Sequence, residues 1–206
     1  MAQSKAASVD AAPMVIMGLD PGSLNTGYGL VAAQNSQITL VAQGVIAAPG
    51  TWAFPQRLAH IHLGLLKIIE EFKPQGLAVE NVFTHKNPAS AFKLAQARGV
   101  AILAAALKEI PVFEYTPSQI KNAVVGHGRA EKSQVAFMVK SVLRINEELA
   151  PDASDALAAA ICHAGQKTLL ALGTAAKPQK SAKSSTKWSS LSVEDLAARG
   201  FKVAKP

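Results

Sequence analysis

Apolar residues recur along this chain at two different spacings, and the spacing separates the expected strands from the expected helices. Short apolar runs bounded by Gly, Pro or polar residues are typical of buried strands. The second and third of these runs follow the first within a few residues, which predicts an antiparallel meander. The five runs that meet this description lie at residues 15–19, 27–33, 38–48, 77–80 and 112–115.

Longer segments with helical spacing surround the later strands. Thr116 and Gln119 fit a capping box with Pro117 at the favoured first position, so a short helix is expected to begin there. An antiparallel opening followed by strand-helix-strand units predicts an α/β domain with a mixed five-stranded sheet flanked by helices. The four longer helices are expected over residues 54–72, 88–108, 129–143 and 152–172.

Composition divides the chain into three regions. Residues 1–13 are rich in Ala and Ser without a periodic apolar face, and we expect them to be disordered. Residues 14–173 carry the periodic pattern of one folded domain, and residues 174–206 form a basic, largely flexible tail. Apolar runs such as residues 99–107 are shorter than the ~20 residues that a bilayer requires. Because no signal peptide is recognisable either, a cytoplasmic protein is expected.

The net charge of +7 points to an anionic partner, but most of it lies in the tail. Residues 174–206 hold seven Lys and Arg against two Asp and Glu, a net charge of +5. A solvated linker explains this tail as well as a nucleic-acid-binding one does. The single cysteine, Cys162, has no intrachain partner for a disulfide, so we interpret it as a small buried apolar residue.

Four acidic residues stand at positions that suit a metal site. Asp20 ends the first expected strand and Glu80 ends the fourth, so their carboxylates meet at one sheet edge if these strands are parallel neighbours. Asp152 and Asp155 lie three apart at the start of a helix, whose positive end favours negative charge. Carboxylate oxygens suit Mg²⁺ or Mn²⁺. Two such ions roughly 3.5–4 Å apart can promote in-line attack at phosphorus.

Each acid taken alone also has an ordinary structural explanation. Asp20 suits a turn in its Asp-Pro-Gly context, and Asp152 suits a helix cap. Glu80 directly follows an apolar run and Asp155 precedes an Ala-rich one, so surface decoration explains these two poorly. Taken together, the four acids favour a metal-dependent active site.

Six motifs, in order, resemble the RuvC family of Holliday-junction resolvases over residues 14–170. The resemblance implies a ribonuclease-H-like fold and a homodimer. It also implies paired, symmetric, Mg²⁺-dependent nicks in a four-way DNA junction during recombination and repair, with RuvA and RuvB type proteins as partners. The motifs are Gly18-Leu-Asp-Pro-Gly-Ser23 with Thr26-Gly-Tyr-Gly29, Ala78-Val-Glu-Asn-Val-Phe83, Ala95-Gln-Ala-Arg-Gly-Val-Ala101, Pro111-Val-Phe-Glu-Tyr115, Val124-Val-Gly126 with Ala130-Glu-Lys-Ser-Gln-Val135, and Asp152-Ala-Ser-Asp-Ala-Leu-Ala158.

The resemblance assigns roles to individual residues. It implies that the four acids are catalytic and hold two Mg²⁺ ions per subunit, for which Mn²⁺ can substitute: Asp20, Glu80, Asp152 and Asp155. It matches Phe83 to an aromatic wedge that stacks on a base, although a core Phe is the alternative without the family context. It matches Lys121 and Lys132 to basic positions near the scissile phosphate. Lys86 and Arg129 are weaker candidates for phosphate contacts, equally well explained as solvated charges.

The Ala-rich segment at residues 95–107 includes Gly99 and can approach another helix closely, which the family uses for dimerisation. A buried core helix is the competing interpretation. A junction-binding protein without cleavage activity would not need all four acids. An actin-like or sugar-kinase ATPase would need a second Gly-rich phosphate loop, which the sequence lacks.

Overall fold

The computed structural model describes residues 12–81 and 87–171. In these residues a mixed five-stranded sheet has the strand order β3-β2-β1-β4-β5. The first three strands are antiparallel, whereas β4 pairs parallel to β1 and β5 parallel to β4. The strands are β1 (Met14–Asp20), β2 (Asn25–Gln34), β3 (Gln37–Ala47), β4 (Gly76–Glu80) and β5 (Val112–Tyr115).

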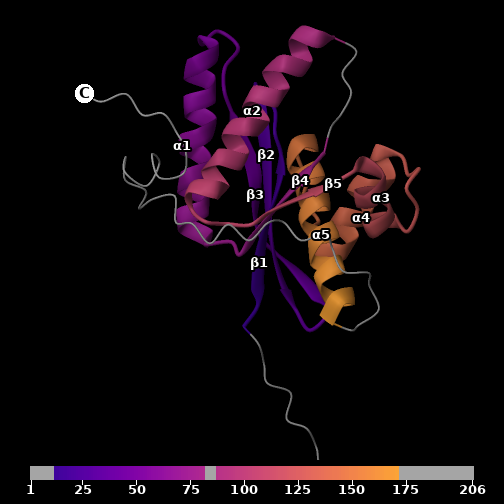
Figure 1. The fold of residues 1–206 in the computed structure, drawn as a ribbon. Helices are drawn as coiled ribbons and strands as arrows, with labels where there is room; N and C mark the ends of the chain where they lie inside the picture. The colour runs from indigo at the N-terminus through magenta and orange to yellow at the C-terminus, as the bar shows by residue number, and fades with distance from the viewer. Residues whose placement is uncertain (1–11, 82–86, 172–206) are drawn as a thin grey trace, which may run out of the picture.

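Helices cover both faces of this sheet, so the molecule has three layers (Figure 1). On one face, α1 and α2 pack over a core that includes Met17 and Leu19 of β1. On the other face, α3, α4 and α5 pack over a core that includes Ile16. This alternation along β1 is the period of two that a strand with both faces buried must show. The helices are α1 (Phe54–Phe72), α2 (Pro88–Leu107), α3 (Pro117–Val125), α4 (Lys132–Leu143) and α5 (Pro151–Ala171).

The contact between α5 and the sheet is unusually close because glycines line the strands beneath it. A Cβ atom at Gly18 would collide with the carbonyl oxygen of Ala156, and one at Gly27 would collide with that of Asp152. The helix supplies mostly alanine in return, and Ala153 and Ala156 are fully buried. Small residues on both sides therefore let the α5 backbone lie directly on β1 and β2.

The sequence prediction of the fold is confirmed in its elements and in the mixed sheet. One boundary differs by three residues, since the helix expected from Arg129 begins at Lys132. Gly126, with a φ of 91°, ends α3, and the side chain of Gln134 accepts a hydrogen bond at 2.9 Å from the backbone N–H of Glu131. That hydrogen bond defines the start of α4, so residues 127–130 form a connection and not a first helical turn.

The expected terminal regions fall largely outside the described residues, as do positions 82–86. The division at residues 13 and 173 therefore stays a prediction. Within the described part of the chain, α2 alone is long and apolar enough to cross a membrane by length and composition. The sequence analysis had considered only the shorter apolar run at residues 99–107 of this helix and had judged it too short. Core helices of proteins without membrane segments pass the same test, but such helices are mostly buried. In α2 only 22% of the apolar window is buried.

The glycine contact predicts a specific loss of stability. Gly18→Ala should lower the free energy of unfolding by about 1–3 kcal/mol or more, because the methyl group meets rigid backbone atoms of α5. Gly165→Ala is the matched control, because no atom lies within 4 Å of the added carbon and alanine favours a helix by roughly 0.5–1 kcal/mol. Urea unfolding monitored by circular dichroism measures both, and equal midpoints would contradict the close contact.

Candidate active site

The carboxyl ends of β1 and β4 bring two of the predicted acids to one edge of the sheet. The parallel register pairs Leu19 with Val79, and Asp20 and Glu80 are the next residues of the two strands. Both side chains are partly buried there. The condition on which the predicted meeting of these two carboxylates depended, that β1 and β4 are parallel neighbours, is therefore met.

Helix α5 carries the other two acids to the same edge. Its N-terminal turn rests on β2, where Gly27 lies against the carbonyl group of Asp152. The proximity appears in the electrostatics: burial and, after it, the charges of Asp155, Asp152 and Glu80 together raise the pKa of Asp20 from its ordinary value of 3.8 to about 7. Four carboxylates thus gather within electrostatic reach of one another, at the end of a helix whose dipole favours negative charge.

Two of the predicted lysines lie beside these acids. Nζ of Lys132 donates a hydrogen bond to Oδ2 of Asp155 at 2.9 Å, and this contact raises the pKa of Lys132. Burial and the charge of Asp155 raise the pKa of Glu80, while Lys132 and Lys121 act in the opposite direction. The lysines therefore offset part of the repulsion among the acids.

A cleft of about 200 Å³ opens at this position. Glu80 of β4, Lys121 of α3, Lys132 of α4 and Asp155 of α5 line it together. Four elements far apart in the sequence therefore supply charged groups to one small cavity. The cleft is lined by two carboxylates and two lysines. The carboxylates suit a metal cation and the lysines suit a phosphate group beside it.

The donor set fits a hard divalent cation, because carboxylate oxygens are the ligands that Mg²⁺ and Mn²⁺ prefer. In the described part of the chain, no three His, Cys, Asp or Glu side chains are yet arranged to hold an ion together. One oxygen of Asp155 accepts a hydrogen bond from Lys132 instead. Burial and the neighbouring carboxylates both disfavour the charged form of Asp20, and a nearby cation would offset this.

The remaining predicted site residues have different outcomes. Arg129 is exposed in the connection before α4 and is not among the residues that line the cleft, so its phosphate contact stays a prediction. Phe83 and Lys86 lie outside the described residues. Cys162 is a buried free cysteine, as expected, and burial raises the pKa of its thiol to about 12.

A buried pair of polar side chains, Tyr115 and His163, lies next to the site, and neither residue was predicted to have a role in it. The hydroxyl of Tyr115 lies 2.6 Å from Nδ1 of His163, and both residues are buried. Tyr115 pairs in register with Glu80, and His163 lies two turns beyond Asp155 on α5. The pair therefore ties the Glu80 edge of the sheet to the helix that carries Asp155. In the sequence, a His within the otherwise apolar face of α5 could have indicated a buried polar contact at this position.

A second unassigned residue, Arg57, holds the turn that follows Asp20. The residue is 8% exposed, and its Nη1 donates a hydrogen bond at 3.1 Å to the carbonyl oxygen of Ser23. Thr26, fully buried, donates from its hydroxyl to the carbonyl oxygen of Gly22 at 2.9 Å. The Asp-Pro-Gly turn is thus fixed on two sides, which restricts how the carboxylate of Asp20 can project.

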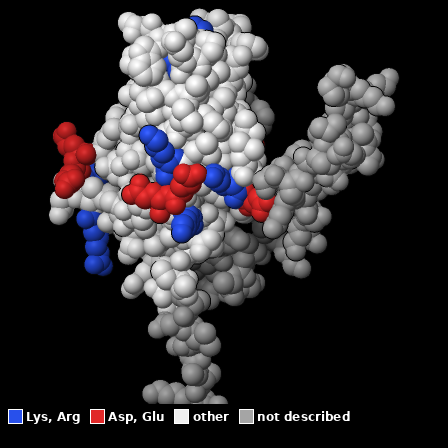
Figure 2. Space-filling view, turned by 90° about the vertical axis from the view of Figure 1, so that its left-hand side faces the viewer, with Lys and Arg blue, Asp and Glu red and all other residues white. Residues whose placement is uncertain are grey.

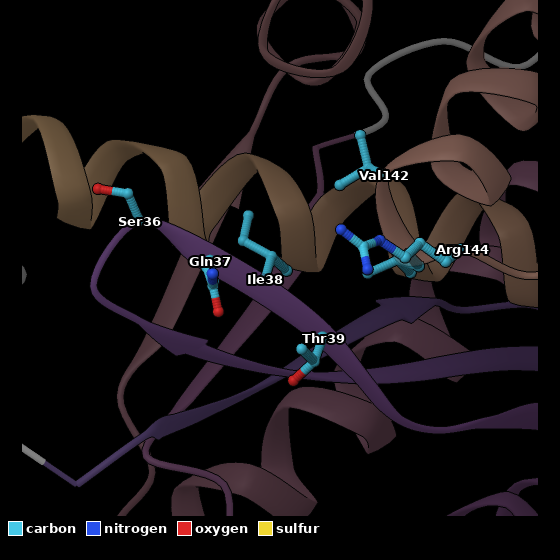
Figure 3. Close-up of a pocket in the computed structure, with 7 residues that line it drawn as sticks. Ser36, Gln37, Ile38, Thr39, Val142 and Arg144 are labelled. Carbon is cyan, nitrogen blue, oxygen red and sulfur yellow. The ribbon is translucent and has the colours of Figure 1, made fainter.

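A larger hollow of about 380 Å³ lies away from these carboxylates. It is bounded by the β2–β3 turn, by the start of β3 and by the end of α4. Figure 3 shows Val142 and Arg144 on one side of it, facing Ile38 of β3. None of the four acids lines it, so size alone does not identify the active site.

The fold and the site together define a class of protein. A mixed sheet in the order 3-2-1-4-5 with acidic residues at the carboxyl ends of β1 and β4 is a ribonuclease-H-like nuclease architecture. The match to a family model is more specific, since residues 16–163 match that of "Crossover junction endodeoxyribonuclease RuvC". This chain belongs to the RuvC family.

Individual relatives agree with this assignment. The chain is 50% identical over 159 residues to the RuvC of Geobacter sp. strain M21, covering 77% of this chain and 97% of the relative. The Thermus thermophilus RuvC solved with a Holliday junction substrate superposes with a TM-score of 0.72 at 34% identity, covering 78% of this chain and 97% of that one. The yeast mitochondrial resolvase Ydc2, at 14% identity and a TM-score of 0.54, shares the fold.

The raised pKa of Asp20 predicts a pH-dependent effect of its replacement. Ionising Asp20 opposes folding, so wild-type stability falls as the pH rises from about 4 to about 7. Asp20→Asn should therefore gain stability over wild type through this window and stay level above it, with roughly 4 kcal/mol as the upper limit. Thermal unfolding in EDTA measures the gain. Glu71→Gln, which changes an exposed acid, is the control, and an equal gain for Asp20→Asn at pH 4 and pH 8 would contradict the assignment.

Proposed function

We propose that this chain is a structure-specific endonuclease that resolves four-way DNA junctions by paired, symmetric, metal-dependent hydrolysis in recombination and repair. The observation that carries the proposal is the gathering of Asp20, Glu80, Asp152 and Asp155 at one edge of the sheet. Membership of the RuvC family supports the choice of DNA junctions as substrate, as does the similarity to a relative solved with a junction.

In this proposal the four carboxylates hold two Mg²⁺ ions per subunit, or Mn²⁺ in their place. When bound, the ions supply activation of the attacking water and stabilisation of the leaving oxygen at phosphorus. The lysines of the cleft have a separate role. Lys121 and Lys132 place positive charge where the scissile phosphate would enter. Lys132, which here donates to Asp155, would be the residue to contact that phosphate if Asp155 held a cation.

Further contacts to the junction are proposed outside the cleft. Phe83 stacks on a base at the opened junction centre, and Lys86 and Arg129 contact phosphates. The basic tail at residues 174–206 adds affinity that does not depend on sequence and weakens with salt. We also propose a cytoplasmic protein that works with branch-migration proteins of the RuvA and RuvB type.

The exposed surface of α2 supports a homodimer. Three large apolar side chains project from this helix, with exposed fractions of 67% for Phe92, 50% for Leu103 and 47% for Leu107. In Figure 2, which faces the α1 and α2 side, the charged groups gather in a band and leave much of the surface uncharged. A second copy covering this helix would present two identical active sites to the symmetry-related strands of a junction.

Removal of single carboxylates tests the catalytic assignment. Asp152→Asn and Glu80→Gln should each lower metal-dependent nicking of a labelled four-way junction by at least roughly a hundredfold, because the ions lose a ligand that balances their charge. Junction binding in EDTA should persist. Denaturing gels and mobility shifts measure the two effects, with Glu71→Gln as the control. Junction binding by wild type without nicks in Mg²⁺ or Mn²⁺ would leave a binding protein instead.

A charged substitution on α2 tests the homodimer. Leu103→Asp should convert the dimer to a monomer, because an ionised carboxylate would be buried without a partner in an apolar interface. Size-exclusion chromatography with light scattering measures the mass. Phe137→Asp changes a side chain on α4 that is 70% exposed and should leave the dimer intact. A dimer that survives Leu103→Asp would place the interface elsewhere.

A further inference from the structure

The hollow at the β2–β3 turn lies at the opposite end of the sheet from the four acids, and no part of the proposed hydrolysis uses it. Asp20 pairs with Gly27 near the start of β2, whereas the turn follows Gln34 at the other end of that strand. The volume of about 380 Å³ falls within the range of pockets that bury a ligand. The hollow is therefore a candidate binding surface that is independent of the catalytic cleft.

The walls of the hollow combine apolar side chains with one positive charge (Figure 3). Leu143 of α4 belongs to the core behind the hollow, Ile38 of β3 packs against that core, and Val142 is 37% exposed. Leu40 points to the same side of β3 as Ile38 and is also 37% exposed, so the apolar surface continues along the strand. Among the described residues that line the hollow, Arg144 alone is charged, and it forms no ion pair with another described residue. A partner of this surface should therefore bring apolar side chains and a carboxylate.

Helix α5 leads the chain to this end of the sheet. Gly27 of β2 lies against Asp152 and Gly29 lies against Leu157, so α5 runs in the same direction as β2. From Leu157 to Ala171 the helix rises by about 21 Å, while β2 extends by about 17 Å from Gly29 to its last residue. The helix therefore ends near the level of the β2–β3 turn, and the chain leaves the described fold at the end of the sheet where the hollow opens.

The chain continues beyond α5 with residues 172–206, which lie outside the described residues. The match to the family model covers residues 16–163, so membership of the family says nothing about this segment. Its own sequence is the available guide to what it does.

The last part of this segment carries the sequence signals of a short capped helix. Ser192 suits the N-cap position, and Gly200 suits the position that follows the C-cap. Leu191 and Leu196 stand where a hydrophobic staple joins the residue before the cap to the fourth helical residue. Phe201 stands where the residue after the terminal glycine packs back on Leu196. Such a helix gathers three large apolar side chains on one side.

This short helix needs a surface, and its charge fits the hollow. A helix over residues 193–198 is far shorter than the ~12 residues below which isolated helices are marginal in water. Glu194 and Asp195 place two carboxylates in its first turn, which complement Arg144. Residues 172–187 span about 20–24 Å as a flexible linker, which suits a site at the same end of the sheet as the end of α5.

We propose that residues 188–201 of this chain dock in the hollow between β3 and α4 as a short capped helix. The three large apolar side chains of the helix cover the wall formed by Ile38 and Val142, and its two carboxylates face Arg144. Docking closes the intervening residues 172–187, which hold four lysines, into a loop at the end of the molecule remote from the acids. The inference goes beyond the proposed nuclease function and does not depend on it.

The fluorescence of Trp188 tests the docking in the full-length chain. In a Trp52→Phe background, Trp188 is the one remaining tryptophan. Its emission should lie at a shorter wavelength than in the same protein carrying Val142→Asp or Leu196→Asp, because either substitution puts a carboxylate into the apolar contact. Quenching of Trp188 by acrylamide should be at least roughly twofold weaker without these substitutions than with them.

Matched variants separate docking from general effects. Phe137→Asp makes the same kind of change on α4 at a side chain that is 70% exposed and does not line the hollow, so it should leave the emission of Trp188 unchanged. Arg144→Glu should expose Trp188 to acrylamide, and adding Glu194→Lys and Asp195→Lys should restore the protection. Circular dichroism checks that each variant is folded, and Leu196→Asp keeps the test open if Val142→Asp does not fold.

Disulfide trapping identifies the occupant of the hollow. In a Cys162→Ala background, Val142→Cys with Ala197→Cys should form a disulfide within one chain under mild oxidation, because bridged Cα atoms lie only about 4.4–6.8 Å apart. Phe137→Cys with Ala197→Cys is the control and should form little of it. Non-reducing gels and mass spectrometry of the digested protein measure the products.

The outcomes decide the proposal without any cleavage assay. Equal quenching of Trp188 with and without Val142→Asp and Leu196→Asp would overturn the docking, as would equal trapping at positions 142 and 137. A disulfide that joins two chains would assign the hollow to the segment of a second copy and overturn docking within one chain. Because none of these readouts involves hydrolysis, failure of the docking leaves the proposed nuclease function intact.

Discussion

The direct contact between the backbone of α5 and the glycines of β1 and β2 is the constraint on which the active site depends. Gly18 and Gly27 admit Ala156 and Asp152 where any side chain would hold the helix away. An added methyl group at either position would move α5 outward, and its N-terminal acids would leave the edge of the sheet where Asp20 ends β1. Packing that looks purely structural therefore sets the distances among the four carboxylates.

That packing also creates an electrostatic problem. Burial and, after it, the charges of the three neighbouring carboxylates raise the pKa of Asp20 to about 7. Lys132 relieves part of the repulsion through its ion pair with Asp155, and Lys132 and Lys121 offset part of the rise in the pKa of Glu80 that burial and Asp155 cause. The fold holds the acids together at a cost in stability, and a bound cation is the physical means of offsetting it. Stability and metal affinity are thus two consequences of one arrangement.

Much of the fold was predictable because local patterns determine it. The period of the apolar residues identified all five strands, and the capping box of Thr116 and Gln119 correctly set the start of α3. The predicted start of α4 was wrong by three residues, since apolar spacing does not show where the side chain of Gln134 accepts the hydrogen bond from the Glu131 N–H that begins the helix. The roles of Arg57 and His163 escaped prediction, because their partners, Ser23 and Tyr115, lie more than thirty residues away in the chain.

The sequence by itself determined the secondary-structure elements and the α/β class, and it identified the four acids as candidate metal ligands. Each of these depends on residue type and on neighbours within a few positions. Only the tertiary structure decided that β1 and β4 are parallel neighbours, that α5 lies on glycine, and that Lys132 contacts Asp155. It also decided that a groove lies beside the cleft, lined in part by Ser154, whose hydroxyl has no hydrogen-bond partner among the described residues. These features need contacts between distant segments, and the free energy of such contacts depends on how the whole chain packs.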